Sequence, residues 1–303
     1  MSGAAAPSPG RKPRDWIACA DDFAIDEGAV DGILQLIERG RITATSALVD
    51  SPLWPRAAER LRAQVHGTPG KTAACADVGL HLNLTQALAT STAAVWPLGE
   101  LVVRCAIGTM PRSLLQAAIE HQLDAFEDAM GQRPDYIDGH QHVHQFAVVR
   151  EALVRALRRR YGSDLPWLRS TRAPAAVHDL KARLIAALGD QGLRKLACAS
   201  HLHTNAYLVG VYNFRADAAA YWRRLVQWVC DGPQATVLMT HPAVRASPDD
   251  ALAAVRPMEF AALASADFGA LLAKAGITLT TGSRLFVRTN VASSGATEAA
   301  ADG

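Results

Sequence analysis

Short apolar runs alternate with amphipathic helical patterns along most of this chain of 303 residues. Neighbouring parallel strands need a crossover connection, usually a helix, so this alternation predicts βα units and a mainly parallel sheet. Strands are expected at residues 16–20, 44–49, 78–84, 135–138, 167–169, 235–240 and 277–280, with a weaker candidate at 195–199.

Seven amphipathic segments predict the helices that connect these strands. The first is the best marked, because Asp26 is a suitable N-cap, Gly40 is a suitable stop, and apolar residues 30, 33, 34 and 37 share one face. Helices are expected at residues 27–39, 54–65, 112–130, 148–159, 176–188, 218–229 and 258–275.

The number of strands favours one domain over two. Seven or eight strands in about 270 ordered residues fit an irregular (β/α) TIM-like barrel, with a doubly wound open sheet as the alternative. We expect a single domain at residues 15–287. Disordered tails are expected at residues 1–14 and 288–303, which are rich in small and polar residues.

Composition excludes several classes of protein. Half of the residues are hydrophobic, which allows a large core, and the net charge of +2 argues against a nucleic-acid partner. No apolar run approaches the roughly 20 residues of a membrane span. The five cysteines have no C-x-x-C spacing, which argues against a disulfide framework and a thiolate zinc site. Because the N-terminus also lacks an apolar leader segment, we expect a cytoplasmic protein.

Polar clusters follow four of the predicted strands. They are Asp21-Asp22, His81 with Asn83, the segment from Asp138 to His144 with three histidines, and His241-Pro242. A carboxylate pair at the end of a buried strand is costly unless a cation or a proton is nearby. Because the carboxyl ends of barrel strands meet at one face, we expect a single site built from distant segments.

The residue types in these clusters point to metal-assisted hydrolysis. One carboxylate and two imidazoles leave open positions on a divalent ion, which is the arrangement of a catalytic site. Such an ion lowers the pKa of bound water and polarises a carbonyl. A second carboxylate would then act as the base and His241 as the acid, which suits hydrolysis of an amide or ester.

Five motifs in this order give the chain a family resemblance, over about residues 16–285. It resembles the YdjC-like (ChbG) family of carbohydrate deacetylases. The resemblance implies a barrel-like α/β fold, one divalent metal ion (magnesium or zinc), an acetylated amino-sugar substrate such as a chitooligosaccharide, and a possible homodimer. The motifs are Ala20-Asp21-Asp22-Phe23, Thr45-Ser46-Ala47-Leu48-Val49, Val78-Gly79-Leu80-His81-Leu82, Asp138-Gly139-His140-Gln141-His142-Val143-His144 and Met239-Thr240-His241-Pro242-Ala243.

The resemblance also implies roles for individual residues. Asp22, His81 and His140 fall at the metal-ligand positions, Asp21 at the base and His241 at the acid. Four further residues are expected to hold a ligand by hydrogen bond or to contact the sugar: His142, His144, Asp138 and Arg169.

The histidine cluster leaves two geometries open. In an extended segment His140, His142 and His144 would share a face, whereas in a helix only His140 and His144 would. Four aromatic residues could stack on a sugar ring, although a core position is more common for such side chains: Trp96, Tyr136, Tyr212 and Trp222.

The chain departs from the family at Ala24, where a glycine is usual, and a positive φ there would strain the backbone. The segment at residues 87–111 also has its own composition. Two other functions stay open on the residues alone. One is a metal-dependent phosphoesterase, and the other is a non-catalytic sugar-binding protein of the same fold.

Overall fold

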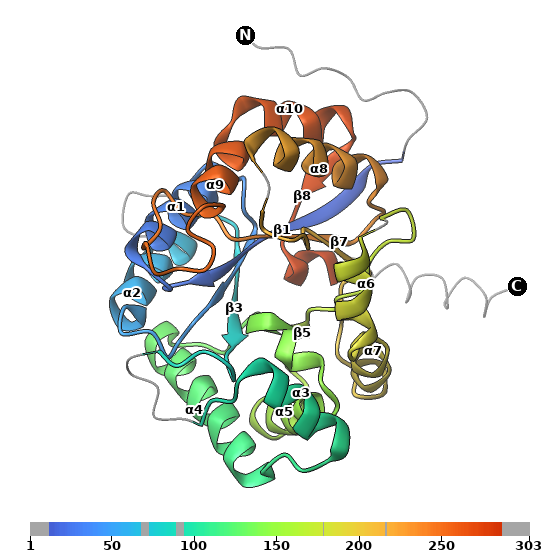
Figure 1. The fold of residues 1–303 in the computed structure, drawn as a ribbon. Helices are drawn as coiled ribbons and strands as arrows, with labels where there is room; N and C mark the ends of the chain where they lie inside the picture. The colour runs from blue at the N-terminus through green and yellow to red at the C-terminus, as the bar shows by residue number, and fades with distance from the viewer. Residues whose placement is uncertain (1–11, 68–72, 89–93, 178, 216, 287–303) are drawn as a thin grey trace, which may run out of the picture.

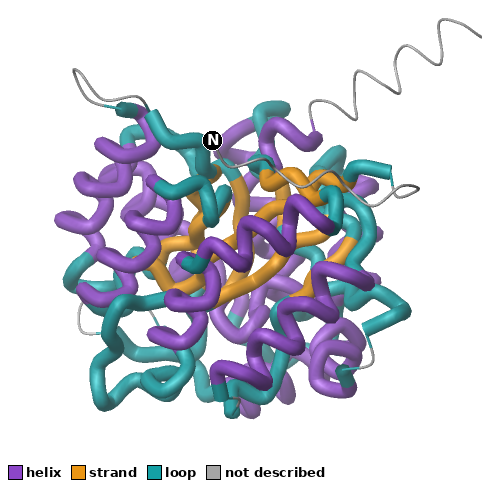
Figure 2. Tube along the Cα trace, turned by 90° about the horizontal axis from the view of Figure 1, so that it is seen from above, coloured by secondary structure: helices purple, strands orange, loops and turns teal. Residues whose placement is uncertain are grey.

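A curled sheet of parallel strands lies at the centre of the fold and helices surround it (Figures 1 and 2). The computed structural model describes residues 12–67, 73–88, 94–177, 179–215 and 217–286. The strand order is β5-β4-β3-β2-β1-β7-β6, and β8 also pairs with β1. The strands are β1 (Arg14–Phe23), β2 (Ala44–Ala47), β3 (Asp77–Leu82), β4 (Tyr136–Gly139), β5 (Trp167–Leu168), β6 (Tyr207–Val209), β7 (Thr236–Thr240) and β8 (Ile277–Leu279).

Most of the helices connect one strand to the next and pack outside the sheet. None of the helices in the described residues is long and apolar enough to cross a membrane. The helices are α1 (Glu27–Glu38), α2 (Trp54–His66), α3 (Leu98–Ile107), α4 (Arg112–Met130), α5 (Ala147–Tyr161), α6 (Leu180–Ala187), α7 (Asp190–Ala199), α8 (Ala218–Asp231), α9 (Arg256–Ala264) and α10 (Ala266–Lys274), with a short 3₁₀ helix η1 (His140–Gln145).

The two edges of the sheet come together between β5 and β6. Leu168 and Thr204 form a parallel bridge there. The Asn205 side chain also bonds the backbone of Ser170 in both directions, at 2.8 and 3.0 Å. The predicted single-domain irregular barrel is therefore confirmed in preference to a doubly wound open sheet.

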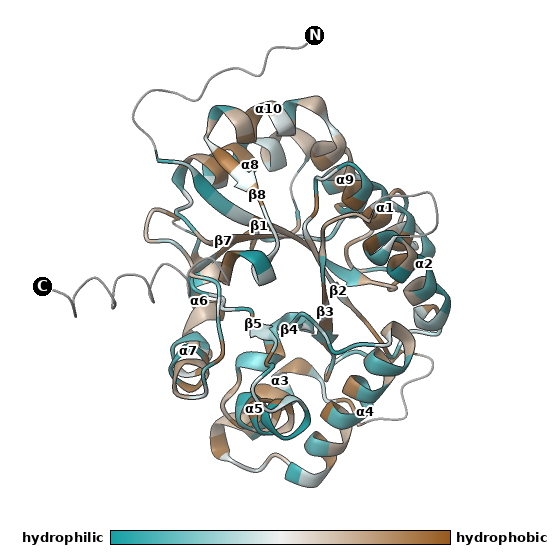
Figure 3. Ribbon diagram, turned by 180° about the vertical axis from the view of Figure 1, so that it is seen from behind, coloured by the Kyte–Doolittle hydropathy of each residue, from teal (hydrophilic) through white to brown (hydrophobic). Residues whose placement is uncertain are grey.

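Side chains alternate between two cores along β1. Ile17 and Cys19 pack in the barrel interior, whereas Trp16, Ala18 and Ala20 pack against the surrounding helices. All five are fully buried, and the apolar colouring of the central strands is visible in Figure 3. Burial on both faces explains why the sequence of such a strand reads as a continuous apolar run.

The first helix forms as its capping signals predict. The Asp26 carboxylate accepts a hydrogen bond from the backbone N–H of Ala29 at 2.7 Å, which satisfies a free donor at the helix start. Gly40 follows the helix with φ of 63°, a conformation that glycine adopts at little cost. The predicted apolar face is buried at Val30, Ile33 and Ile37.

Several predicted boundaries are wrong. Residues 195–199 belong to α7 and not to a strand, residues 98–107 form α3, and β6 was not expected. The predicted helix at 258–275 is two helices, because Ser265 is extended and its hydroxyl caps the second one. The predicted helix at 176–188 begins only at Leu180. Arg14, expected in the N-terminal tail, opens β1, while residues 1–11 and 287–303 lie outside the described part of the chain.

Candidate active site

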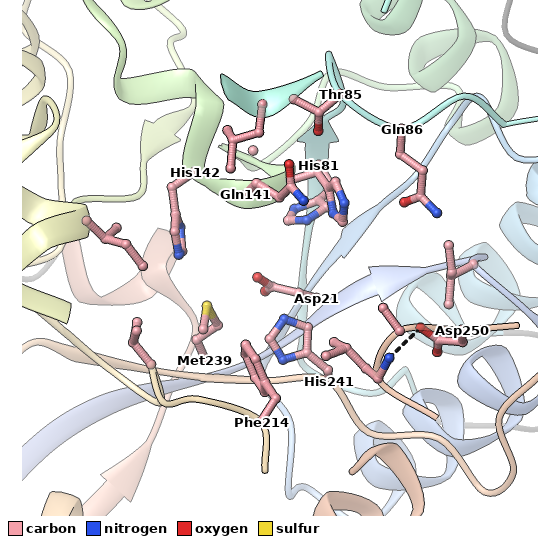
Figure 4. A pocket seen from close by; sticks show the side chains of 18 of the residues that line it. Asp21, His81, Thr85, Gln86, Gln141, His142, Phe214, Met239, His241 and Asp250 are labelled. Atoms are coloured by element: carbon pink, nitrogen blue, oxygen red, sulfur yellow. Dashed lines mark hydrogen bonds between the residues drawn. The ribbon is translucent and has the colours of Figure 1, made fainter. Parts of the chain in front are cut away.

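The carboxyl ends of β1, β3, β4 and β7 open into one pocket of about 920 Å³ (Figure 4). This volume lies within the usual range for a small-molecule site. The pocket wall contains Asp21 from β1, His81 from β3 and His241 after β7, with His140 and His142 after β4. The structure therefore brings together the polar strand ends that the sequence singled out.

An irregularity at the end of β1 turns both aspartates toward the site. Successive residues of a regular strand point to opposite faces, so Asp21 and Asp22 would normally diverge. Here the register with β2 shifts between Ala20 and Phe23, and Asp22 has φ of 62°. Asp21 consequently continues the interior row of Cys19, while Asp22 approaches the histidines of β3 and η1. Ala24 also has a positive φ, 73°, so the backbone adopts there the conformation that costs an alanine more than the glycine usual in the family.

Asp22, His81 and His140 form a group with the geometry of metal ligands. The Oδ1 atom of Asp22 lies 3.4 Å from His81 Nε2 and 3.3 Å from His140 Nδ1. One ligand atom from each residue lies within 4.8 Å of the others. Two ligands at about 2.0 Å from a tetrahedral ion are roughly 3.3 Å apart, so these three residues fit one divalent ion.

The surroundings of His81 fit the same role. Its second nitrogen, Nδ1, donates to Asp138 Oδ1 at 2.6 Å, which fixes the ring as such bonds do for metal-bound imidazoles. Burial disfavours a charged imidazole, but the carboxylates of Asp138 and Asp22 outweigh burial and raise the pKa of His81 to about 10. The pocket floor thus attracts positive charge to this position.

Asp21 is held by a guanidinium in the barrel interior. Both of its oxygens accept hydrogen bonds from Arg169, at 2.6 and 2.7 Å, and Arg169 also pairs with Asp138. Burial opposes ionisation, but Arg169 outweighs burial and holds the pKa of Asp21 well below its usual range. Asp21 is therefore a carboxylate at neutral pH. The same guanidinium contacts Cys19 Sγ at 2.8 Å, so it fills the space among Cys19, Asp21 and Asp138.

Arg256 is a site residue that the sequence reasoning missed. Its guanidinium is buried and donates to Asp22 Oδ2 at 2.8 Å, while it also binds Asp250. Burial opposes ionisation of Asp22, but Arg256 and the two histidines lower its pKa well below the usual range. One oxygen of Asp22 is therefore taken by Arg256, and the other faces the imidazoles.

His241 is positioned by its backbone as well as by its ring. Its N–H donates to the buried Glu259 at 2.6 Å, and Glu259 also accepts from the Tyr212 hydroxyl at 2.6 Å. Phe214 meets the imidazole edge-on, with ring centroids 5.2 Å apart. The Nδ1 atom of His241 has no hydrogen-bond partner among the described residues. Figure 4 shows the ring beside Asp21, facing into the pocket.

The histidine cluster adopts neither of the two expected geometries. It forms the 3₁₀ helix η1, in which Gln141 and His142 have φ of 53° and 60°. This turn separates the rings, so that His140 reaches Asp22, His142 lines the pocket, and His144 donates to the carbonyl of Arg169 at 2.8 Å. Burial lowers the pKa of His142 and of His144, the latter to about 4.

None of the four aromatic residues suggested for sugar stacking lines the pocket. Tyr136 and Tyr212 are buried in the core, Trp96 is nearly so, and Trp222 packs against the core from outside. Phe214 is the aromatic ring that faces the pocket together with Phe146. Phe214 lies in a loop next to Asn213, and no pattern in the sequence there indicates that its ring faces the pocket.

The chain is similar to known proteins over most of its length. The sequence profile described as YdjC-like protein matches residues 16–274. A carbohydrate deacetylase of Mus musculus is 30% identical over 171 residues, covering 52% of this chain and 50% of the relative. A chitooligosaccharide deacetylase of Serratia marcescens is 28% identical over 233 residues, covering 75% of this chain and 81% of the relative.

The chain thus spans about half the length of the mouse relative and most of the bacterial one. A crystal structure of an Enterococcus faecalis V583 protein superposes with a TM-score of 0.65 at 21% identity, covering 90% of this chain and 99% of that one. This likeness shows the fold.

Proposed function

Because this chain belongs to the YdjC-like family, we propose that it is a metal-dependent hydrolase that removes the N-acetyl group from an acetylated amino sugar or chitooligosaccharide. The relatives named carbohydrate deacetylase and chitooligosaccharide deacetylase support this reaction and substrate class. The observation that carries the proposal is the convergence of Asp22, His81 and His140 beside Asp21 and His241 at one pocket.

In this proposal Asp22, His81 and His140 hold one divalent ion. When bound, the ion supplies a Lewis acid that polarises the acetyl carbonyl and lowers the pKa of water. Two imidazoles and one carboxylate suit zinc or a similar transition metal better than magnesium. Asp138 and Arg256 orient two of these ligands, through His81 and Asp22 respectively.

Asp21 and His241 move the protons. Arg169 keeps Asp21 ionised, and each carboxylate oxygen has a second lone pair with which to accept a proton from the attacking water. His241 donates a proton to the departing sugar nitrogen, and Glu259 and Phe214 hold it in place to do so. His142 faces the same pocket and contacts the sugar.

A two-ion phosphoesterase is less well supported. A second group with ligand-like spacing consists of Cys19, Asp21 and Asp138. Arg169 binds all three of these side chains, so a positive group already fills the place that a second ion would take. Charge repulsion then disfavours a further cation there.

The test is acetate release from diacetylchitobiose, together with the metal content of the purified protein. Asp22→Ala and His140→Ala should each abolish both, and a chelator should abolish activity in the parent protein. His66→Ala, at an exposed histidine of α2, is the matched control and should change neither. Full activity in either ligand variant would show that the site is assigned wrongly.

A further inference from the structure

Arg256, the first residue of α9, bridges two carboxylates at the pocket. Its Nη2 atom donates to Asp22 Oδ2 at 2.8 Å, and its Nε atom donates to Asp250. The Arg256 side chain is 2% exposed, so this cation is held almost entirely out of water. Burying a cation is costly unless it is well paired, and one of its two partners here is a proposed metal ligand. The guanidinium is therefore in direct contact with the proposed ligand set.

The two oxygens of Asp22 face different partners. His81 Nε2 and His140 Nδ1 lie beside Oδ1, at 3.4 and 3.3 Å, whereas Arg256 lies beside Oδ2. A carboxylate binds an ion through one oxygen or through both, and the second mode requires the ion to approach both oxygens. An ion drawn toward Oδ2 would also approach the guanidinium and be repelled by it. Asp22 is therefore restricted to ligation through Oδ1.

The loop between β7 and α9 keeps the guanidinium in place. The backbone N–H of Arg256 donates to the carbonyl of Leu252 at 3.1 Å, and the carbonyl of Arg256 accepts from Ala243 at 3.2 Å. Asp250 is fixed in turn, because its Oδ1 atom accepts from the N–H of Leu252 at 2.9 Å. The position of Arg256 is thus set by contacts that do not involve the metal ligands.

One-oxygen ligation by Asp22 bears on which ion the site accepts. Together with His81 and His140 it gives three single-atom ligands, which leaves one position for water on a four-coordinate ion such as zinc. Mg²⁺ and Mn²⁺ prefer oxygen ligands and octahedral coordination, so they gain most from a second carboxylate oxygen. Keeping Oδ2 away from the ion therefore disfavours these harder ions.

We propose that Arg256 is a positioning residue that restricts Asp22 to one-oxygen ligation and so sets the preference of this site for a four-coordinate transition metal. The inference deepens the proposed function and rests on it, since it takes Asp22, His81 and His140 to be the metal ligands. A purely structural ion pair that joins α9 to β1 is the competing explanation. Replacing Arg256 would then leave the coordination of the ion unchanged.

The test replaces Arg256 in the full-length protein and loads the protein with Co²⁺. The visible absorption bands of Co²⁺ are strong in four-coordinate sites and weak in six-coordinate ones, so they report the coordination number directly. The parent protein should show strong bands. Arg256→Gln removes the guanidinium and frees Oδ2 of Asp22, so the bands should weaken several-fold as the coordination number rises.

The same variant should change the choice of ion. Kd is measured for Zn²⁺ by competition with a chelating dye and for Mn²⁺ by the electron paramagnetic resonance signal of the free ion. The ratio of the Mn²⁺ Kd to the Zn²⁺ Kd should fall about tenfold in Arg256→Gln, which is the order of one added contact to a charged group. A general loss of stability would move both Kd values together and leave their ratio unchanged.

Arg194→Gln is the matched control. Arg194 pairs with the buried Asp190 at 2.9 Å on α7, and neither residue lines the pocket. Its loss removes a comparable ion pair, so the Co²⁺ spectrum and the Kd ratio should stay those of the parent. If Arg256→Gln fails to fold because Asp250 loses its cation, the double variant Arg256→Gln with Asp250→Asn is measured in its place, with the same expected results.

Three results would overturn the inference. They are weak six-coordinate bands in the parent, a spectrum and Kd ratio that Arg256→Gln leaves unchanged, and equal changes in Arg194→Gln. Failure of the proposed function is distinguishable from these. A parent with the expected spectrum and ratio that releases no acetate from diacetylchitobiose would refute deacetylation alone. A Co²⁺ site that persists in His140→Ala would refute the metal ligands, and with them both proposals.

Discussion

A half-buried carboxyl group just before β4 makes the stability of this fold depend on pH. Asp135 precedes Tyr136, and its Oδ2 atom accepts a hydrogen bond from the backbone N–H of Val78 at 2.8 Å. Burial and the neighbouring charge of Asp77 raise the pKa of Asp135 to about 6 from its ordinary value of 3.8. The perturbation we consider is Asp135→Asn, which keeps an oxygen for Val78 and removes the titration.

The raised pKa of Asp135 determines the direction in which stability changes with pH. Below pH 3.8 the carboxyl is protonated in both the folded and the unfolded chain, so its contribution to stability is fully present. As the pH rises from 3.8 to 6, only the unfolded chain loses the proton, and the free energy of unfolding falls. Each pH unit in this window is worth about 1.36 kcal/mol, so the loss reaches at most about 3 kcal/mol above pH 6.

The variant should therefore match the parent protein at pH 4 and exceed it by up to about 3 kcal/mol at pH 7.5. For a chain of this length that difference raises Tm by roughly 6 °C. Urea denaturation at both pH values measures the free energies directly. Asp128→Asn, at an exposed position of α4, is the control for removing one negative charge. A stability difference that stays constant between pH 4 and pH 7.5 would refute the reasoning.

Two further substitutions test the packing of the barrel interior. Arg169→Met leaves Asp21 and Asp138 buried without their cation, and should lower the free energy of unfolding at pH 7 by about 3–5 kcal/mol; an unchanged urea midpoint would contradict this. Gly79→Ala places a Cβ atom 2.5 Å from the Tyr136 ring on the paired strand and should lower the free energy of unfolding by about 1–3 kcal/mol. Adding Tyr136→Leu to the same chain should partly restore the midpoint of a thermal melt.

The sequence predicts the parts of this fold whose causes are local. Buried parallel strands read as apolar runs, so seven strands were placed to within a few residues, and a capping aspartate and a following glycine located α1. The helix α3 had such signals as well, because Leu98, Leu101, Val102 and Cys105 share a face and Gly108 ends it with φ of 73°. No helix was expected in this segment all the same.

Other features depend on contacts that no local pattern reveals. Arg256 lies 234 residues from Asp22, and an arginine at the start of a helix is unremarkable until the fold brings the two together. The positive φ values of Gln141 and His142 are equally hidden, since only a few per cent of residues other than glycine adopt that conformation and no local pattern marks these two. They decide which histidine reaches Asp22, so the roles within the cluster could not be assigned from sequence.

The guanidinium of Arg169 links the end of β5 to β1 and β4 across the barrel interior, and this has a consequence for how the chain assembles. A fragment holding only the first four strands would carry the carboxylates of Asp21 and Asp138 inward with no cation between them. Packing that interior face away from water would bury two like charges, which destabilises such a fragment. Docking of β5 brings the guanidinium to these carboxylates and supplies one of the two edges that close the barrel, so barrel closure and the pairing of the interior charges are coupled. Any new chemistry acquired at position 21 would therefore need a simultaneous change at position 169.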